Sequence, residues 1–202
     1  MPPILKTRAA VMHEFGAPLV IEEIELKPPA DDEVIVKMAA SGICGTDLSV
    51  IHCNLPYPPP VVLGHEGAGV VEWAGPDVKH VAVGDHVVLS VTHECGTCGY
   101  CSRGIENLCE RTVKAVEELQ DLAFTKDGVD IGRFCGIASF AERSAVRGYQ
   151  CIKIDKNVPL ERACLVGCAV VTGVGAVINK AKVQPGQSVA VAIAGTRGPP
   201  TE

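Results

Sequence analysis

Four cysteines with short, regular gaps are the first feature of the sequence that could carry chemistry. Cys95, Cys98, Cys101 and Cys109 form the pattern C-x2-C-x2-C-x7-C. A tetrahedral zinc site needs four converging ligands with Zn–S bonds of about 2.3 Å, and two-residue gaps let a tight turn point successive sulfur atoms inward. Four thiolates leave no open coordination position. The spacing therefore predicts a structural zinc ion, held in a lobe over about residues 92–112.

Two other interpretations of this cluster compete with zinc. A chance group of reduced thiols is improbable for four cysteines at this spacing. An iron–sulfur cluster is the stronger rival, because bacterial ferredoxins share two successive C-x2-C gaps. Their fourth cysteine, however, follows after three residues and precedes a proline, whereas here the gap is seven and Glu110 follows. The pattern favours zinc.

Three further places hold ligand-type side chains among glycines. Cys44 lies in the segment GICGTD (residues 42–47), His65 in GHEGAG (64–69), and Cys168 directly follows Gly167. Taken alone, a single cysteine is more often a small core residue, and a single histidine is more often a hydrogen-bonded structural one. Spacing cannot bring these residues together, because they are dispersed along the sequence between residues 44 and 168.

The composition excludes several classes of protein. Hydrophobic residues make up 47% of the 202 residues and charged residues 21%, which allows a sizeable core and excludes wholesale disorder. A net charge of −6 with only 4% aromatic residues argues against nucleic acid as a partner. The uncharged stretch 163–178 is shorter than the roughly 20 residues of a membrane span and contains glycines, so no membrane partner is expected. Ten cysteines without a visible secretion signal indicate a reducing compartment, so the predicted location is cytoplasmic.

The elements that must position these residues are predicted to be mostly short strands. Segments rich in Val and Ile lie between turns that use the 21 glycines and 14 prolines, a pattern typical of a barrel or a sandwich. The predicted strands are residues 7–12, 19–26, 33–41, 67–73, 86–91, 139–146 and 151–154. Residues 114–123 fit either a short surface helix or a solvated loop.

The last part of the sequence follows a different pattern. Residues 170–182 have the apolar spacing of a helix, residues 185–186 form a turn, and residues 188–194 have the composition of a buried parallel strand. A helix, a turn and an apolar strand followed by Gly195 resemble the opening of a doubly wound α/β domain.

In this order and spacing, the segments 42–47 and 64–69, the four-cysteine lobe and the stretch 167–175 resemble the zinc-dependent medium-chain alcohol dehydrogenases. The branch with glutathione-dependent formaldehyde dehydrogenase and the aryl or aliphatic alcohol dehydrogenases is the most similar. The resemblance runs from about residue 9 to residue 194. It implies a mainly β, GroES-like barrel as catalytic domain over residues 1–169. Residues 170–202 are then the first helix and strand of a truncated Rossmann nucleotide-binding domain.

The same resemblance implies a second zinc ion, so that each chain holds two. Cys44, His65 and Cys168 are the implied catalytic zinc ligands, and Glu66 lies beside the metal, able to ligate it when water or substrate leaves. Two thiolates and an imidazole leave one open position, where an alcohol loses its proton more readily. Hydride then passes to NAD. A cysteine at 168, where polyol and threonine dehydrogenases usually have glutamate, favours the alcohol branch.

Three more roles are implied by the motif positions. Thr46 hydrogen-bonds the substrate oxygen and begins a proton relay, and Asp47 orients His65. Many relatives continue the relay through a histidine three residues after Thr46, but Ser49 stands there in this sequence, and His52 lies nearby.

The implied cofactor-binding residues are Thr172 and Gly195. Thr172 matches a position that packs against nicotinamide, although an ordinary residue at a helix N-terminus fits the position equally. Gly195 matches the first glycine of a G-x-G-x-x-G turn, but Arg197 and Pro200 occupy the places of the next two glycines. We therefore expect the last eight residues to come from a frameshifted or prematurely ended reading frame, or from a cloning scar. NAD binding is expected in the full-length enzyme and homo-oligomers only at full length, with weak or no NAD binding by these 202 residues.

Two functions from different classes follow from these observations. The first is the catalytic-domain part of a zinc- and NAD-dependent alcohol dehydrogenase that acts on a small alcohol or aldehyde. The second is a stand-alone, non-catalytic zinc-binding module without a nicotinamide site. The open ligand set of the second zinc site favours the first, and the incomplete nucleotide-binding part favours the second.

Overall fold

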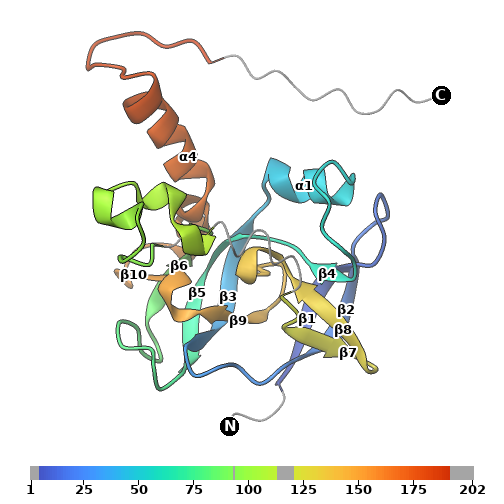
Figure 1. The fold of residues 1–202 in the computed structure, drawn as a ribbon. Helices are drawn as coiled ribbons and strands as arrows, with labels where there is room; N and C mark the ends of the chain where they lie inside the picture. The colour runs from blue at the N-terminus through green and yellow to red at the C-terminus, as the bar shows by residue number, and fades with distance from the viewer. Residues whose placement is uncertain (1–4, 93, 113–120, 192–202) are drawn as a thin grey trace, which may run out of the picture.

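The structure, a computed structural model, describes residues 5–92, 94–112 and 121–191, and its strands form two sheets (Figure 1). The first sheet is a closed barrel of five strands in the order β1-β2-β7-β8-β4. These strands are β1 (Leu5–Met12), β2 (Val20–Leu26), β4 (Val61–Val62), β7 (Phe124–Lys126) and β8 (Val129–Arg133). The second sheet also has five strands, in the order β10-β6-β5-β3-β9. They are β3 (Glu33–Gly42), β5 (Glu66–Ala74), β6 (His86–Leu89), β9 (Arg143–Arg147) and β10 (Cys151–Ile154). The predicted mainly β barrel fold is confirmed.

The pairing of β3 with β5 brings together the segments that contain Cys44 and His65. The two strands run antiparallel along almost their whole length, and the last pair joins Gly42 to Glu66. The chain leaves β3 toward Cys44 and enters β5 from His65, so two dispersed segments of the sequence meet at one end of this strand pair. Two register irregularities, between Ile35 and Val36 and between Met38 and Ala40, interrupt the pairing and bend the strands locally.

The core follows the alternation of apolar side chains along the strands. One cluster of buried side chains joins the barrel strands to the adjoining part of the second sheet, and includes Val11, Ile24, Leu26, Phe124 and Ile131. A second cluster fills the space under the other sheet and includes Val34, Val36, Val87, Leu89 and Val146. Residues 34 and 36, like 87 and 89, are two apart and therefore lie on the same face of their strands.

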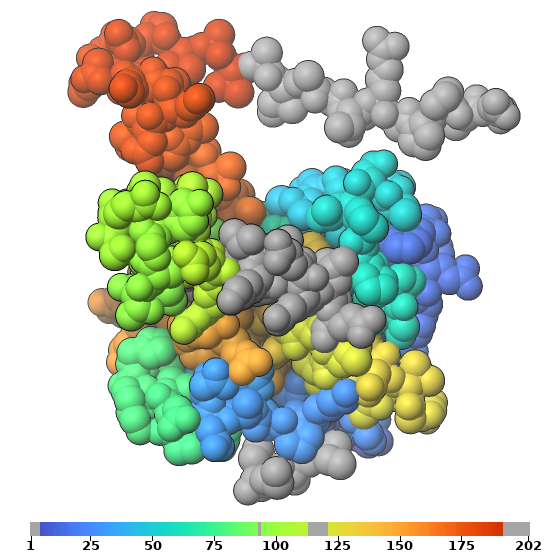
Figure 2. Space-filling model, in the orientation of Figure 1, coloured from blue at the N-terminus to red at the C-terminus, as the bar shows by residue number. Residues whose placement is uncertain are grey.

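Short helical segments connect the strands. They are α1 (Gly45–Ile51), η1 (Cys101–Arg103), η2 (Glu106–Leu108), η3 (Phe134–Gly136), η4 (Gly148–Gln150), α3 (Leu160–Ala163) and η5 (Cys164–Gly167). They are followed by α4 (Ala169–Gly175) and the π-helical segment η6 (Ala176–Lys180). Helix α4 and residues 176–191 project from the rest of the described chain (Figures 1 and 2). No single helix among the described residues is long and apolar enough to cross a membrane. Two consecutive helical segments, residues 160–167 and 169–180, reach the required length and apolar composition only when taken together, and they are bent by 52° at their junction.

The predicted elements agree with the structure for most strands. The segments predicted at 7–12, 19–26, 33–41, 67–73, 86–91 and 151–154 correspond to β1, β2, β3, β5, β6 and β10. The helix predicted at 170–182 is present over residues 169–180. The predicted strand 139–146 is wrong in its first half, because residues 139–142 form a loop that joins the barrel through the Ala9–Ala141 bridge.

Two further predictions fall partly outside the described residues. The strand predicted at 188–194 is absent over residues 188–191, because no described strand lies beside them and a parallel strand needs a neighbour for its backbone hydrogen bonds. Residues 192–194 lie outside the described part. The ambiguous segment 114–123 lies largely outside it as well, and its described end, residues 121–123, is neither helix nor strand.

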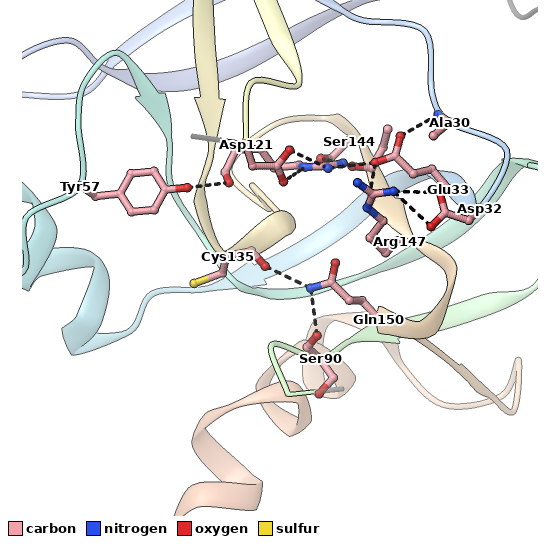
Figure 3. Close-up of polar contacts among 12 residues, drawn as sticks. Ala30, Asp32, Glu33, Tyr57, Ser90, Asp121, Cys135, Ser144, Arg147 and Gln150 are labelled. Carbon is pink, nitrogen blue, oxygen red and sulfur yellow. Dashed lines mark hydrogen bonds and ion pairs between the residues drawn. The ribbon is translucent and has the colours of Figure 1, made fainter. Parts of the chain in front are cut away.

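A buried arginine ties the two sheets together. The guanidinium group of Arg133 donates to Glu33 Oε1 at 2.9 Å and to both carboxylate oxygens of Asp121, at 2.8 and 3.0 Å, as well as to the backbone oxygen of Ala145. The Tyr57 hydroxyl donates to the Arg133 carbonyl at 3.1 Å. Figure 3 shows Tyr57, Asp121 and Glu33 approaching this centre from three different segments. Burial alone lowers the pKa of Arg133, but the charges of Asp121 and Glu33 outweigh it and raise the pKa, so this guanidinium stays charged.

Candidate metal centres

The four cysteines of the lobe converge as their spacing predicts. The sulfur atoms of Cys95, Cys98, Cys101 and Cys109 all lie within 4.8 Å of one another. The Cys95 and Cys101 sulfur atoms are 4.0 Å apart. A tetrahedron with Zn–S bonds of about 2.3 Å has edges of about 3.8 Å, so the arrangement fits a four-thiolate zinc site.

Backbone N–H groups of the lobe point at the sulfur atoms. The Cys98 N–H donates to the Cys95 sulfur at 3.2 Å, the Cys101 N–H to the Cys98 sulfur at 3.5 Å, and the Cys95 N–H to the Cys109 sulfur at 3.3 Å. Such donors favour the charged thiolate over the thiol. Hydrogen bonds, first among them that from the Thr97 backbone, lower the pKa of Cys95 to about 6. Desolvation and the neighbouring thiols raise the pKa of Cys101 to about 12.

A second set of ligand-type side chains comes together from separate parts of the sequence. One ligand atom each of Cys44, His65, Glu66 and Cys168 lies within 4.8 Å of the others. Cys44 lies between β3 and α1, His65 precedes β5, Glu66 begins β5, and Cys168 lies between η5 and α4. His65 and Glu66 are only 3% and 2% exposed, whereas Cys44 and Cys168 are half-buried, so the imidazole and the carboxylate are shielded from water more than the two thiols. The structure thus brings together the four residues that the resemblance implied.

Asp47 ties the segments that carry Cys44 and His65 to each other. Its Oδ2 accepts the Cys44 N–H at 2.9 Å, which caps α1. Its Oδ1 accepts the Gly64 N–H at 3.1 Å and lies 3.3 Å from His65 Nδ1. Asp47 is fully buried. Because Nδ1 faces this carboxylate, the other ring nitrogen, Nε2, is the one free to bind a metal.

The protonation properties of this set differ among its members. Burial raises the pKa of Cys44, but hydrogen bonds from Thr46 and the neighbouring His65 outweigh it, so the net shift is downward. Burial lowers the pKa of His65, but the hydrogen bond and charge of Asp47, followed by Cys44, raise it overall. Burial, followed by the charge of Cys44 and of Glu66, raises the pKa of Cys168 to about 12. A divalent cation would balance the negative charge of a Cys44 thiolate and the Glu66 carboxylate, which is the setting in which thiolates bind zinc.

The residues named for the proton relay lie along α1. The Thr46 hydroxyl oxygen is 3.5 Å from the Cys44 sulfur, at the edge of the ligand set. Ser49, in the relay position, instead donates its hydroxyl proton to the Gly45 carbonyl at 3.0 Å. His52 is exposed at the end of the helix.

Two residues beside this site were not predicted from the sequence. The Phe134 ring packs edge-on against His65, with ring centres 5.7 Å apart, and against Tyr57 at 5.1 Å. The next residue, Cys135, has a positive φ of 55° and its carbonyl accepts a hydrogen bond from the Gln150 amide at 3.0 Å (Figure 3). Nothing in the spacing of the sequence marks either residue, because only the fold carries η3 to the ligand set.

Of the two implied cofactor-binding residues, the structure describes Thr172. Thr172 is exposed on the first turn of α4, where its N–H donates to the Cys168 carbonyl at 2.9 Å, as in any helix. Gly195 lies outside the described residues. Their roles toward nicotinamide remain predictions.

Comparisons with known proteins agree with this geometry. Residues 30–156 match the family model described as the alcohol dehydrogenase GroES-like domain, and the chain belongs to this family. The predicted resemblance is therefore confirmed. An NDMA-dependent alcohol dehydrogenase of Amycolatopsis methanolica is 44% identical over 172 residues, which cover 84% of this chain and 46% of that protein.

Two further relatives extend the comparison. An S-(hydroxymethyl)glutathione dehydrogenase of Synechocystis is 43% identical over 192 residues, covering 93% of this chain and 52% of that protein. The solved structure of an alcohol dehydrogenase zinc-binding domain protein from Burkholderia ambifaria superposes with a TM-score of 0.82 at 40% identity, covering 91% of this chain and 51% of that chain. The chain thus spans about half the length of these relatives.

Proposed function

We propose that this chain is the catalytic-domain part of a zinc-dependent alcohol dehydrogenase, which oxidises an alcohol or reduces an aldehyde with a nicotinamide cofactor. The observation that carries the proposal is the convergence of Cys44, His65, Glu66 and Cys168 within 4.8 Å. A purely structural barrel has no need of a ligand set that combines two thiols, an imidazole and a carboxylate. Family membership and the dehydrogenase names of the relatives support the same conclusion.

Two zinc ions per chain fit the two clusters. Cys95, Cys98, Cys101 and Cys109 would hold a structural ion with no open position. Cys44, His65 and Cys168 would hold the other, with Glu66 beside it. When bound there, zinc would supply positive charge that acidifies an alcohol hydroxyl, and NAD or NADP in the full-length enzyme would supply the hydride acceptor.

The chain's own residues have distinct tasks in this reaction. Asp47 holds Nδ1 of His65, which fixes the ring orientation and leaves Nε2 for the metal. The Thr46 hydroxyl, beside Cys44, is placed to accept the proton of the substrate hydroxyl. Since the Ser49 hydroxyl is bonded to the Gly45 carbonyl, the proton does not continue through Ser49 in this conformation. Phe134 covers the His65 ring and keeps water from that side of the site.

The remaining parts of the proposal concern the whole protein. Thr172 and Gly195 would contact the nicotinamide cofactor, and the substrate would be a small alcohol or aldehyde. A cytoplasmic location and a homo-oligomer of the full-length protein complete the proposal.

Metal analysis and metal spectroscopy test the proposal. We expect two zinc ions per wild-type chain, one in His65→Ala, and two in the control His52→Ala, since His52 is exposed at the end of α1. In the cobalt-loaded wild type, benzyl alcohol is expected to shift the visible absorption, and in His65→Ala it is not. One zinc per wild-type chain, with no response to the alcohol, would instead favour a non-catalytic zinc-binding module.

A further inference from the structure

Gly42 leaves a space that the Glu66 carboxylate occupies. The two residues face each other at the end of the β3–β5 pair, and both are buried. A Cβ atom built on Gly42 would lie 2.2 Å from Glu66 Oε2, 3.0 Å from Glu66 Cβ and 2.9 Å from Leu165 Cδ2. The first distance is far below van der Waals contact, so any other residue at position 42 must displace the carboxylate.

The backbone at Gly42 does not itself require glycine. Its φ lies outside the left-handed region that excludes side chains, unlike that of Gly64, whose φ is +88°. The requirement at position 42 is therefore one of space only, and the neighbour that takes the space is a buried carboxylate.

That carboxylate belongs to the second ligand set. An oxygen of Glu66 lies within 4.8 Å of the Cys44 sulfur, a His65 ring nitrogen and the Cys168 sulfur. The place of this oxygen decides how much negative charge surrounds a bound metal ion and whether a carboxylate can reach it.

We propose that Gly42 is a positioning residue, which keeps the Glu66 carboxylate beside the Cys44, His65 and Cys168 ligand atoms by having no side chain of its own. The inference rests on the proposed function, because it takes this ligand set to be a metal site. It assigns to Gly42 an effect that passes mainly through the Glu66 carboxylate, whose Oε2 is the atom nearest to an added Cβ.

The experiment uses the visible absorption of the cobalt-loaded chain in Gly42→Ala, Glu66→Ala and the double variant. We expect Gly42→Ala to shift the d–d bands and to change the cobalt dissociation constant on the order of tenfold, as changes beside metal ligands do. Adding Gly42→Ala to Glu66→Ala should change both quantities much less, because the nearest atom, Glu66 Oε2, is then gone and only the longer contacts with Leu165 and the Cβ of residue 66 remain. Gly148→Ala is the matched control: its Cβ would lie 2.9 Å from Val78 Cγ2, and neither residue belongs to the ligand set, so the bands should stay unchanged.

Thermal unfolding keeps the proposal testable if Gly42→Ala folds poorly. Its loss of stability should then be largely restored in the double variant with Glu66→Ala. A Gly42→Ala spectrum identical to wild type, an equal shift with and without Glu66, or no restoration of stability would each overturn the inference and leave the metal site intact. A wild type that binds no second metal would overturn the proposed function and the inference together.

Discussion

The buried carboxylate of Asp47 lies 3.3 Å from His65 Nδ1 and at the same time holds the N–H groups of Cys44 and Gly64. One side chain therefore fixes the backbone that carries a cysteine ligand, the loop before β5 and the orientation of the imidazole. The candidate second metal centre depends on this residue, although Asp47 is not itself among the proposed ligands.

Replacing Asp47 by asparagine is expected to weaken metal binding at the second centre by about 10- to 100-fold. Asparagine has one acceptor oxygen and cannot receive hydrogen bonds from the Cys44 and Gly64 N–H groups and from His65 through two oxygens. Competition with a chelator measures the affinity. Ser49→Ala, on the same helix, should leave it unchanged; equal affinities for Asp47→Asn and wild type would refute the role.

Replacing Cys98 by serine should remove one of two metal equivalents and lower the melting temperature. Its sulfur is one of four within 4.8 Å, and a hydroxyl is a poor substitute for a thiolate toward zinc. Metal analysis and thermal unfolding, with and without added zinc, measure both effects. The exposed Cys53 offers a control, because Cys53→Ser should keep both equivalents; the assignment fails if the two variants behave alike.

The sequence predicted the long strands better than the short ones. Residues 33–41 and 67–73 have enough Val and Ile between turns to be recognised, whereas β4, with two residues, and β7, with three, owe their existence to partners across the barrel. Helix α1 was missed because its seven residues include β-branched Thr46 and Val50; the cap formed between Cys44 and Asp47 defines its start.

The two candidate metal centres also differ in how well the sequence alone predicts them. The lobe cysteines lie within 15 residues of one another, so local turns decide their geometry and spacing alone was informative. The second centre is assembled by the β3–β5 pairing and by η5, and no local pattern contains that information. The family resemblance supplied it. No sequence pattern identifies Gly42 or Phe134, because their roles depend on their contacts with Glu66 and His65 in the folded structure.

Stability should respond to acid through Asp85. The hydrogen bond from the Lys153 ammonium group, followed by that from the Ala82 N–H, lowers the pKa of this carboxyl. A lowered pKa in the folded state means that the charged form stabilises the fold above the ordinary value of about 3.9 and that this contribution is lost as the pH falls through the folded value. Asp85→Asn should therefore unfold more easily than wild type at pH 7, with the difference shrinking below about pH 4. Urea unfolding across this range checks the sign; a difference that grows in acid would contradict it.

Arg133 should be among the residues whose loss costs the fold most. Its side chain is 2% exposed, and removing it leaves Glu33, itself 9% exposed, as a buried charge without its nearest cation. Breaking a buried ion pair from one side costs about 3–5 kcal/mol, so Arg133→Met should lower the free energy of unfolding by that amount. The same substitution at Arg143, whose pair with Glu72 is 26% and 35% exposed, should cost only about 0–1 kcal/mol. Equal costs for Arg133→Met and Arg143→Met in urea unfolding would show that the network in Figure 3 does not hold the two sheets together.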